Sequence, residues 1–243
     1  MDTFGIGKNL SVIVPRALGG LPAASRAGTP TLFGRILGLL ILLANSGCHD
    51  GIRSSREDLL DLSILQPALR LDLRYATANN FTGHILYPSP RAFLLAPTAH
   101  ALLSVEEDLK RQGYGLLIYD AYRPQRITQA LFDSATPQQR REGYVADPSK
   151  GSRHNRGCAV DLGLWDLQQQ QVSLMPTGFD EFSERAHSDA SKGPTEALLN
   201  RERLRSAMAK EGFKELPNEW WHFDDRDCDS HPIRDWVWWD QTP

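Results

Sequence analysis

The stretch over residues 152–161 constrains this chain more than any other part of the sequence. It places His154 seven positions before Asp161, with Gly157 between them to allow a sharp bend. Beyond the glycine, alternating residue types predict a β-strand over residues 158–165, with Asp161 on one face between two small residues. The small neighbours leave room beside the carboxylate for an ion. The apolar residues on the opposite face, expected to line the core, are Val160, Leu162 and Leu164.

A second pair of polar residues lies near the C-terminus, where Glu219 stands three residues before His222. With His154 and Asp161, this pair completes a set of two imidazoles, one ligating carboxylate and one spare carboxylate. Such a set is typical of a hydrolytic zinc site, which keeps one coordination position open for water. Glu219 is the natural base for that water.

Strand parity places a condition on this second pair. On a regular strand Glu219 and His222 would point to opposite sides. Both can reach one metal ion only if the chain turns or bulges there, or if Glu219 still lies in the loop that Pro217 and Asn218 favour.

Helix and strand signals mix along the rest of the chain without a regular repeat. Leucine alternates with charge over residues 68–75, which predicts a half-buried strand. Further expected elements are helices at 98–112, from Pro124 onward and at 195–211, and strands at 115–119 and at the end of 213–223. The mixture predicts an α+β fold, a single compact domain with a central antiparallel sheet flanked by helices. The tryptophan-rich tail, 236–239, should pack back on the body.

The 243-residue chain is long enough for one domain with a proper core. Its formal net charge is -3, and it contains no block of lysine or arginine. Because nucleic-acid binders concentrate positive charge, we expect no nucleic-acid partner.

The first residues have the pattern of an export leader. Basic residues precede a short apolar run at 36–44, and small residues follow it, which is the order of a secretory signal. The run is short for a bilayer span, which needs roughly 20 apolar residues. We therefore expect a signal segment at 1–47, a polar tether at 48–57 and a catalytic domain at 58–243, and hence an exported, periplasmic protein.

Three cysteines bear on how the exported chain is processed. Cys48 ends the segment Ala44–Cys48, which resembles a bacterial lipobox except that Asn45 replaces the usual leucine. Lipid attachment at Cys48, which would tether the protein to a membrane, and simple cleavage nearby are both open. Cys158 and Cys228 could form a disulfide if the protein is exported, or they could remain free thiols.

The two metal motifs resemble those of the zinc D-Ala-D-Ala peptidases, peptidase family M15. Residues 152–161 read Ser-x-His-x-x-Gly-x-Ala-x-Asp, and residues 219–222 read Glu-x-x-His. Residues 119–124 (Tyr-Asp-Ala-Tyr-Arg-Pro) and 74–83 (Arg-Tyr-Ala-Thr-Ala-Asn-Asn-Phe-Thr-Gly) are similar to the D-alanyl-D-alanine dipeptidases related to the vancomycin-resistance enzyme. The similarity extends over roughly residues 60–230, most of the expected mature chain.

This resemblance implies one zinc ion per chain and a set of site residues. The zinc ligands would be His154, Asp161 and His222. Glu219 would be the general base and acid, and Arg123 would stabilise the tetrahedral oxyanion, a role that its fixed charge suits. Tyr75 and Ser152 would line the dipeptide pocket.

Three functions compete at this point. The first is a dipeptidase that hydrolyses D-Ala-D-Ala to two D-Ala in cell-wall turnover or salvage. The second is a D,D-carboxypeptidase that trims peptidoglycan stem peptides, which export would favour. The third is a non-catalytic wall-binding module stapled by zinc, although structural zinc sites usually have four protein ligands. The sequence specifies neither the pocket size nor the oligomeric state.

Overall fold

The structure is a computed structural model that describes residues 58–240. The predicted signal segment at 1–47, the tether at 48–57 and the proposed lipid attachment at Cys48 lie outside the described residues. The catalytic domain that the sequence predicts is therefore described almost in full.

Six strands form the main sheet, in the order β2-β4-β5-β8-β7, with β6 paired to the C-terminal end of β5. The strands are β2 Arg70–Leu71, β4 Tyr114–Asp120, β5 Ala159–Asp166, β6 Gln171–Val172, β7 Lys214–Leu216 and β8 Glu219–Asp224. Neighbouring strands are antiparallel, except that β2 and β4 are parallel. The predicted central antiparallel sheet is confirmed. Two further strands, β1 Leu59–Asp61 and β3 Phe93–Leu95, form a separate antiparallel pair.

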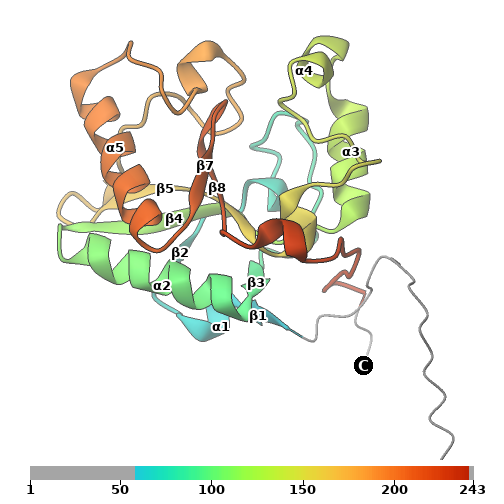
Figure 1. Ribbon diagram of the computed structural model, residues 1–243, viewed down its shortest axis with the longest axis horizontal. Helices are drawn as coiled ribbons and strands as arrows, with labels where there is room; N and C mark the ends of the chain where they lie inside the picture. The colour runs from blue at the N-terminus through green and yellow to red at the C-terminus, as the bar shows by residue number, and fades with distance from the viewer. Residues whose placement is uncertain (1–57, 241–243) are drawn as a thin grey trace, which may run out of the picture. The chain divides into compact units, whose positions relative to one another are not determined.

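Helices flank the main sheet (Figure 1). The α-helices are α1 Leu62–Leu65, α2 Ala96–Lys110, α3 Gln125–Ser134, α4 Pro137–Arg141 and α5 Thr195–Lys210. Single turns of 3₁₀ helix are η1 Arg74–Ala76, η2 Arg153–Arg156, η3 Glu184–Ala186 and η4 Cys228–Ser230. None of the helices within residues 58–240 is long and apolar enough to cross a membrane.

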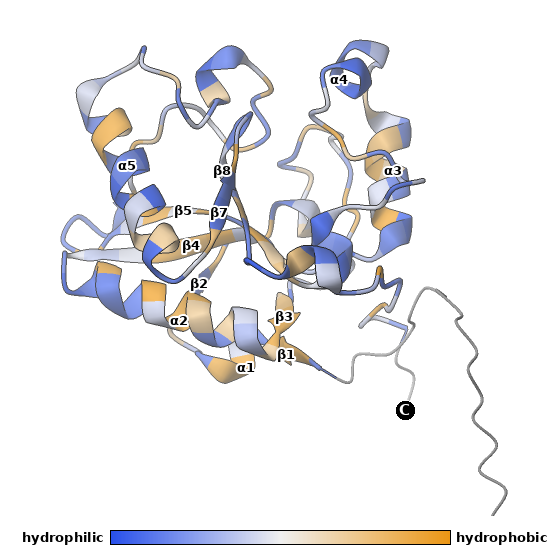
Figure 2. Ribbon diagram, in the orientation of Figure 1, coloured by the Kyte–Doolittle hydropathy of each residue, from blue (hydrophilic) through white to orange (hydrophobic). Residues whose placement is uncertain are grey.

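The main core lies between the sheet and helices α2 and α5. Val160, Leu162 and Leu164 of β5 are fully buried there, as strand parity predicted. Figure 2 shows hydrophobic residues along β5 and alternating hydrophobic and polar stripes on α2. Because burial of apolar surface is worth about 25 cal/mol per Å², this face fixes the orientation of β5. Asp161 is thereby directed to the other face of the strand.

A second, aromatic core contains the C-terminal tail. The ring centroid of Phe93 lies 5.1 Å from that of Trp236 and 5.3 Å from that of Trp238. The tail therefore packs back on the body, as predicted. The same cluster buries Cys158 and Cys228, which form a disulfide across 70 residues of sequence. The structure thus resolves the alternative that the sequence left open.

Two expected elements differ from the structure. The strand predicted over residues 68–75 is reduced to β2, because its pairing with β4 ends near Ile118, whose carbonyl accepts a hydrogen bond from Asp72 at 2.8 Å. The chain then turns into η1, which contains Tyr75. The helix expected from Pro124 begins one residue later, with Pro124 in an extended conformation as its N-cap.

Candidate active site

Three potential metal ligands meet on the polar side of β5 and β8. His222 Nδ1 lies 2.9 Å from Asp161 Oδ1, and His154 Nε2 lies 3.2 Å from the same oxygen. The two ring nitrogens are 3.1 Å apart. Ligands of tetrahedral zinc, bound at about 2.0–2.1 Å, are separated by roughly 3.3 Å. The three atoms therefore have a suitable spacing for one zinc ion.

The outer nitrogen of each imidazole is already occupied. His154 Nδ1 donates to the carbonyl oxygen of Ala121 at 2.6 Å, and His222 Nε2 donates to Asp224 Oδ1 at 2.9 Å. Neither outer nitrogen is available to a metal ion, so each imidazole would coordinate zinc through the nitrogen that faces Asp161. The proton that His222 Nδ1 shares with Asp161 Oδ1 would be displaced on zinc binding.

Local structure explains how His154 reaches Asp161. Ser152 caps η2, because its Oγ accepts a hydrogen bond from the His154 backbone N–H at 3.3 Å. Gly157 ends this turn with φ +80°, a conformation that side chains disfavour. The chain then enters β5, where Asp161 pairs directly with His222 of β8. All three ligands are buried.

A bulge in β8 meets the condition that strand parity placed on Glu219. Leu216 pairs with Glu219, whereas the preceding Glu215 pairs with Phe223, so β8 contains extra residues between these two pairs. The irregularity lets Glu219 and His222 face the same cavity, although Glu219 is the first residue of the strand rather than part of a loop. Burial raises the pKa of the Glu219 carboxyl to about 8.

Arg123 is held rigidly beneath the ligands. Its Nε and a terminal nitrogen donate to Asp120 Oδ2 at 2.9 and 2.8 Å, and a terminal nitrogen lies 3.7 Å from Asp161 Oδ2. The guanidinium also lies over the ring of Tyr75, 5.2 Å from its centroid. Tyr87 donates to the other oxygen of Asp120 at 2.9 Å. This network fixes a positive charge beside the three ligands.

The electrostatics of the ligand cluster favour a cation. Burial alone would lower the pKa of His222, but its hydrogen bonds to Asp161 and Asp224 raise it to about 10. Burial alone would raise the pKa of Asp161, but its contacts with His154 and His222 hold that pKa well below the usual range. The cluster therefore attracts positive charge, as a metal site must.

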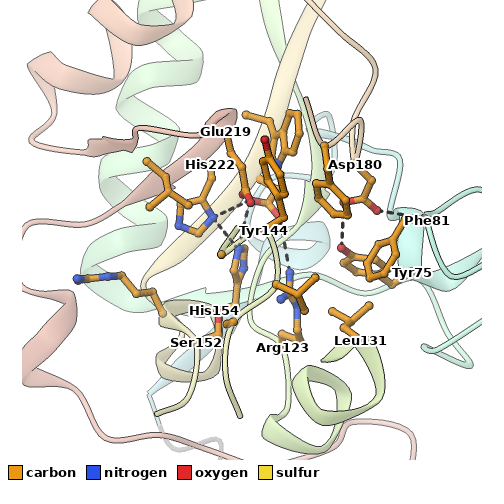
Figure 3. Close-up of a pocket in the computed structure, with 18 of the residues that line it drawn as sticks. Tyr75, Phe81, Arg123, Leu131, Tyr144, Ser152, His154, Asp180, Glu219 and His222 are labelled. Atoms are coloured by element: carbon orange, nitrogen blue, oxygen red, sulfur yellow. Dashed lines mark hydrogen bonds and ion pairs between the residues drawn. The ribbon is translucent and has the colours of Figure 1, made fainter. Parts of the chain in front are cut away.

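All seven site residues predicted from the sequence line one cavity of about 250 Å³ (Figure 3). They are Tyr75, Arg123, Ser152, His154, Asp161, Glu219 and His222. His154, His222 and Ser152 lie toward one side of the view, and Tyr75 lies toward the other with Arg123 between them. The cavity is smaller than most small-molecule pockets, which generally start at about 300 Å³.

Comparison with known proteins identifies the family. Residues 55–235 match the model of the family Peptidase_M15, described as D-Ala-D-Ala dipeptidase. The chain belongs to this family. It is 38% identical to the D-alanyl-D-alanine dipeptidase of Escherichia coli K12 over 74% of this chain and 91% of that one. Identity to the Enterococcus faecium enzyme of the same name is 35%, over 65% and 87% of the two chains.

Solved structures show more distant similarity. A vancomycin-resistance D,D-pentapeptidase in complex with Zn(II) is 16% identical, with a TM-score of 0.36 over 57% of this chain and 75% of that one. The LdcB LD-carboxypeptidase is 17% identical, with a TM-score of 0.42 over 72% and 73% of the two chains.

Family membership makes this chain a metallopeptidase, and its residues fit zinc, the metal on which the family depends. Two imidazole nitrogens and one carboxylate oxygen are ligands that catalytic zinc sites use. The three residues that would hold the zinc line the same cavity as Glu219.

Asp180 lines the cavity as well, although it is not among the site residues predicted from the sequence. Asp180 accepts hydrogen bonds from the Tyr75 hydroxyl at 3.2 Å and from the Phe81 backbone N–H at 3.4 Å. Its φ of +62° is rare for a non-glycine residue, and such strain concentrates at functional sites. Burial raises its pKa to about 7, and the charge of Asp161 adds to the rise. Both hydrogen-bond donors are neutral, so the carboxylate can receive a cation from a ligand.

Proposed function

We propose that the protein hydrolyses the D-alanyl-D-alanine dipeptide to two molecules of D-Ala. The observation that carries this proposal is the small cavity in which a three-ligand zinc site, Glu219 and Arg123 lie opposite Asp180. The relatives named D-alanyl-D-alanine dipeptidase support the same substrate. In this proposal, zinc is held by His154, Asp161 and His222, with one ion per chain.

The chain's own residues divide the reaction between them. When bound, zinc supplies the positive charge that acidifies a water toward a pKa of about 7 and polarises the peptide carbonyl. Glu219 accepts the proton of the attacking water and then passes it to the leaving amino group. Its raised pKa suits the second half of this cycle, because the carboxyl holds a proton more readily than an ordinary glutamic acid. Arg123 donates hydrogen bonds to the oxyanion that forms at the carbonyl.

Charge in the cavity favours a free dipeptide over a stem peptide. A dipeptide carries an ammonium group close to the bond that is cleaved, and Asp180 offers a half-buried carboxylate on the side of the cavity where Tyr75 and Phe81 lie (Figure 3). A stem peptide has an amide at that position and would give the carboxylate no opposite charge, only its two neutral hydrogen-bond donors. Ser152 and Tyr75 line the same cavity and would contact the substrate.

The change Asp180→Asn tests this selectivity. It should raise KM for D-Ala-D-Ala about 30-fold, since the loss of one partner of a buried charge pair costs about 2 kcal/mol or more. N-acetyl-D-Ala-D-Ala, which has no ammonium group, should be cleaved equally poorly by both proteins. Steady-state kinetics on the two substrates measure the effect. An equal loss for both substrates would contradict the role given to Asp180.

The two alternative functions are less well supported by the site. A D,D-carboxypeptidase would need room for a longer chain, whereas this cavity is small and contains a carboxylate suited to an amino terminus. A wall-binding module stapled by zinc would need no base, yet Glu219 is buried beside the ligands with its carboxyl in the cavity. An uncommitted carboxylate of this kind is what hydrolysis requires.

We also propose that the protein is exported. The order of charge and hydropathy in residues 1–47 supports this, and so does the disulfide between Cys158 and Cys228, because disulfides persist in oxidising compartments. An exported dipeptidase would serve salvage of wall dipeptide. Cell fractionation should recover the protein with the periplasm or with a membrane; recovery in the cytosol would argue against export.

A further inference from the structure

Three aromatic side chains from three separate loops meet over the cavity. The rings of Tyr144 and Phe182 stack with centroids 5.1 Å apart and planes 21° apart. The rings of Phe182 and Phe81 meet edge to face at 5.2 Å and 64°. All three residues line the cavity, and each is only half-buried. Each of these residues therefore both lines the cavity and is partly exposed to solvent.

Phe182 is the central ring, since it contacts both of the others. Tyr144 belongs to the segment that follows α4. This segment is bounded by Gly143 at φ +75° and Gly151 at φ +73°. Phe81 comes from the loop after η1, and its backbone N–H is bound by Asp180. The row of rings thus joins three loops that are distant in sequence. In Figure 3, Phe81 lies beside Asp180, and Tyr144 lies between Asp180 and the side of the cavity with His222.

We propose that Phe81, Tyr144 and Phe182 form an aromatic roof that excludes peptides extended at their amino end. This inference rests on the proposed function, in which Asp180 binds the substrate ammonium group. An added residue extends a peptide by roughly 3.5 Å. Phe81 is a neighbour of Asp180 in the same cavity, and its ring packs on that of Phe182, so in this proposal an extension past Asp180 meets these two rings.

The roof and Asp180 select the substrate by different physical means. Asp180 senses charge, because a blocked amino group offers its carboxylate no positive charge to pair with. The roof senses length, because its rings occupy the space that a third residue needs. A tripeptide of D-alanine keeps a free ammonium group but carries it one residue farther out. It is therefore the probe that separates the two effects.

The experiment compares Phe182→Ala with the wild-type enzyme, both loaded with zinc. Removal of the central ring breaks both ring contacts and opens the roof. The ratio of kcat/KM for D-Ala-D-Ala-D-Ala to kcat/KM for D-Ala-D-Ala should rise by about 10-fold or more, the scale on which pocket size discriminates between substrates. Tyr144→Ala, which opens one end of the row, should raise the ratio by a smaller factor.

Phe132→Ala is the matched control, since Phe132 is also half-buried but lies on α3 outside the cavity. Its ratio should equal that of the wild type. Zinc content and the melting temperature report whether each variant is folded, and Tyr144→Ala supplies the test if Phe182→Ala is not. A fall in kcat/KM by the same factor for both substrates, or an unchanged ratio in both roof variants, would overturn the proposal. A wild-type enzyme that holds zinc but fails to cleave D-Ala-D-Ala would instead overturn the proposed function.

Discussion

Replacing Glu219 with alanine should lower kcat for D-Ala-D-Ala by about 10³-fold, the typical contribution of a positioned general base and acid. Zinc should remain bound, because Glu219 is not one of the three clustered ligands. The physical reason for the loss is that the other carboxylates lining the cavity in the described part of the chain already have partners. Asp161 contacts His154 and His222, Asp224 contacts His222 and Arg153, and Asp180 accepts hydrogen bonds from Tyr75 and Phe81. Steady-state kinetics with zinc analysis of the same samples measure both quantities.

Glu215→Ala is the control for this experiment. Glu215 lies on β7, close to Glu219 in sequence, but it does not line the cavity. Its variant should keep wild-type kcat. If Glu219→Ala kept both zinc and turnover, the role of Glu219 as base would be wrong. If it lost zinc together with activity, Glu219 would be acting as a metal ligand instead.

Removing the disulfide should have the largest effect on stability. A bond that closes a 70-residue separation restricts the unfolded chain, and loop entropy of this size is worth about 4 kcal/mol. The double change Cys158→Ala and Cys228→Ala should therefore lower the free energy of unfolding by about 4 kcal/mol and the melting temperature by roughly 10 °C. Urea denaturation followed by tryptophan fluorescence measures the difference.

The wild-type protein with its disulfide reduced provides an internal comparison. Its stability should approach that of the double variant, and a thiol reductant should leave the double variant unchanged. If the free energy of unfolding fell by less than about 1 kcal/mol, the cross-link would restrict the unfolded chain far less than loop entropy predicts. The bond joins residue 158, which precedes β5, to η4, which follows β8, so it also connects the two strands that bear Asp161 and His222.

The clustering of the three proposed zinc ligands could be predicted in part because the positions of His154 and Asp161 depend on local rules. His154 and Asp161 are separated by one tight turn and half a strand, and strand parity decides which side Asp161 faces. The apolar residues on the other face of β5 are buried as that parity requires. The sequence indicated only that a turn or bulge was needed for Glu219 and His222 to reach one metal ion. Where β8 accommodates the extra residues is decided by its pairing with β7.

Asp180 could not be predicted, because nothing local identifies it. It lies 105 residues from Tyr75, its hydrogen-bond partner, and it belongs to no motif of regular spacing. Only the folded loops bring it to the cavity. Asp120 is a different case, since it lies three residues before Arg123 and the two form an ion pair of 2.8 Å. That spacing is a local signal that the sequence analysis did not use, whereas the hydrogen bond of Asp120 to Tyr87 depends on the tertiary fold.

The most direct measurement counts the D-Ala released from free D-Ala-D-Ala and from a pentapeptide stem. It is made on the zinc-loaded enzyme, after zinc is removed with a chelator, and again after zinc is restored. The structure places three residues that can hold zinc, together with Glu219, in a cavity of about 250 Å³. We therefore predict release of D-Ala from the dipeptide alone, lost on chelation and recovered with zinc. Equal release from the pentapeptide, or dipeptide hydrolysis that survives chelation, would contradict a zinc-dependent dipeptidase.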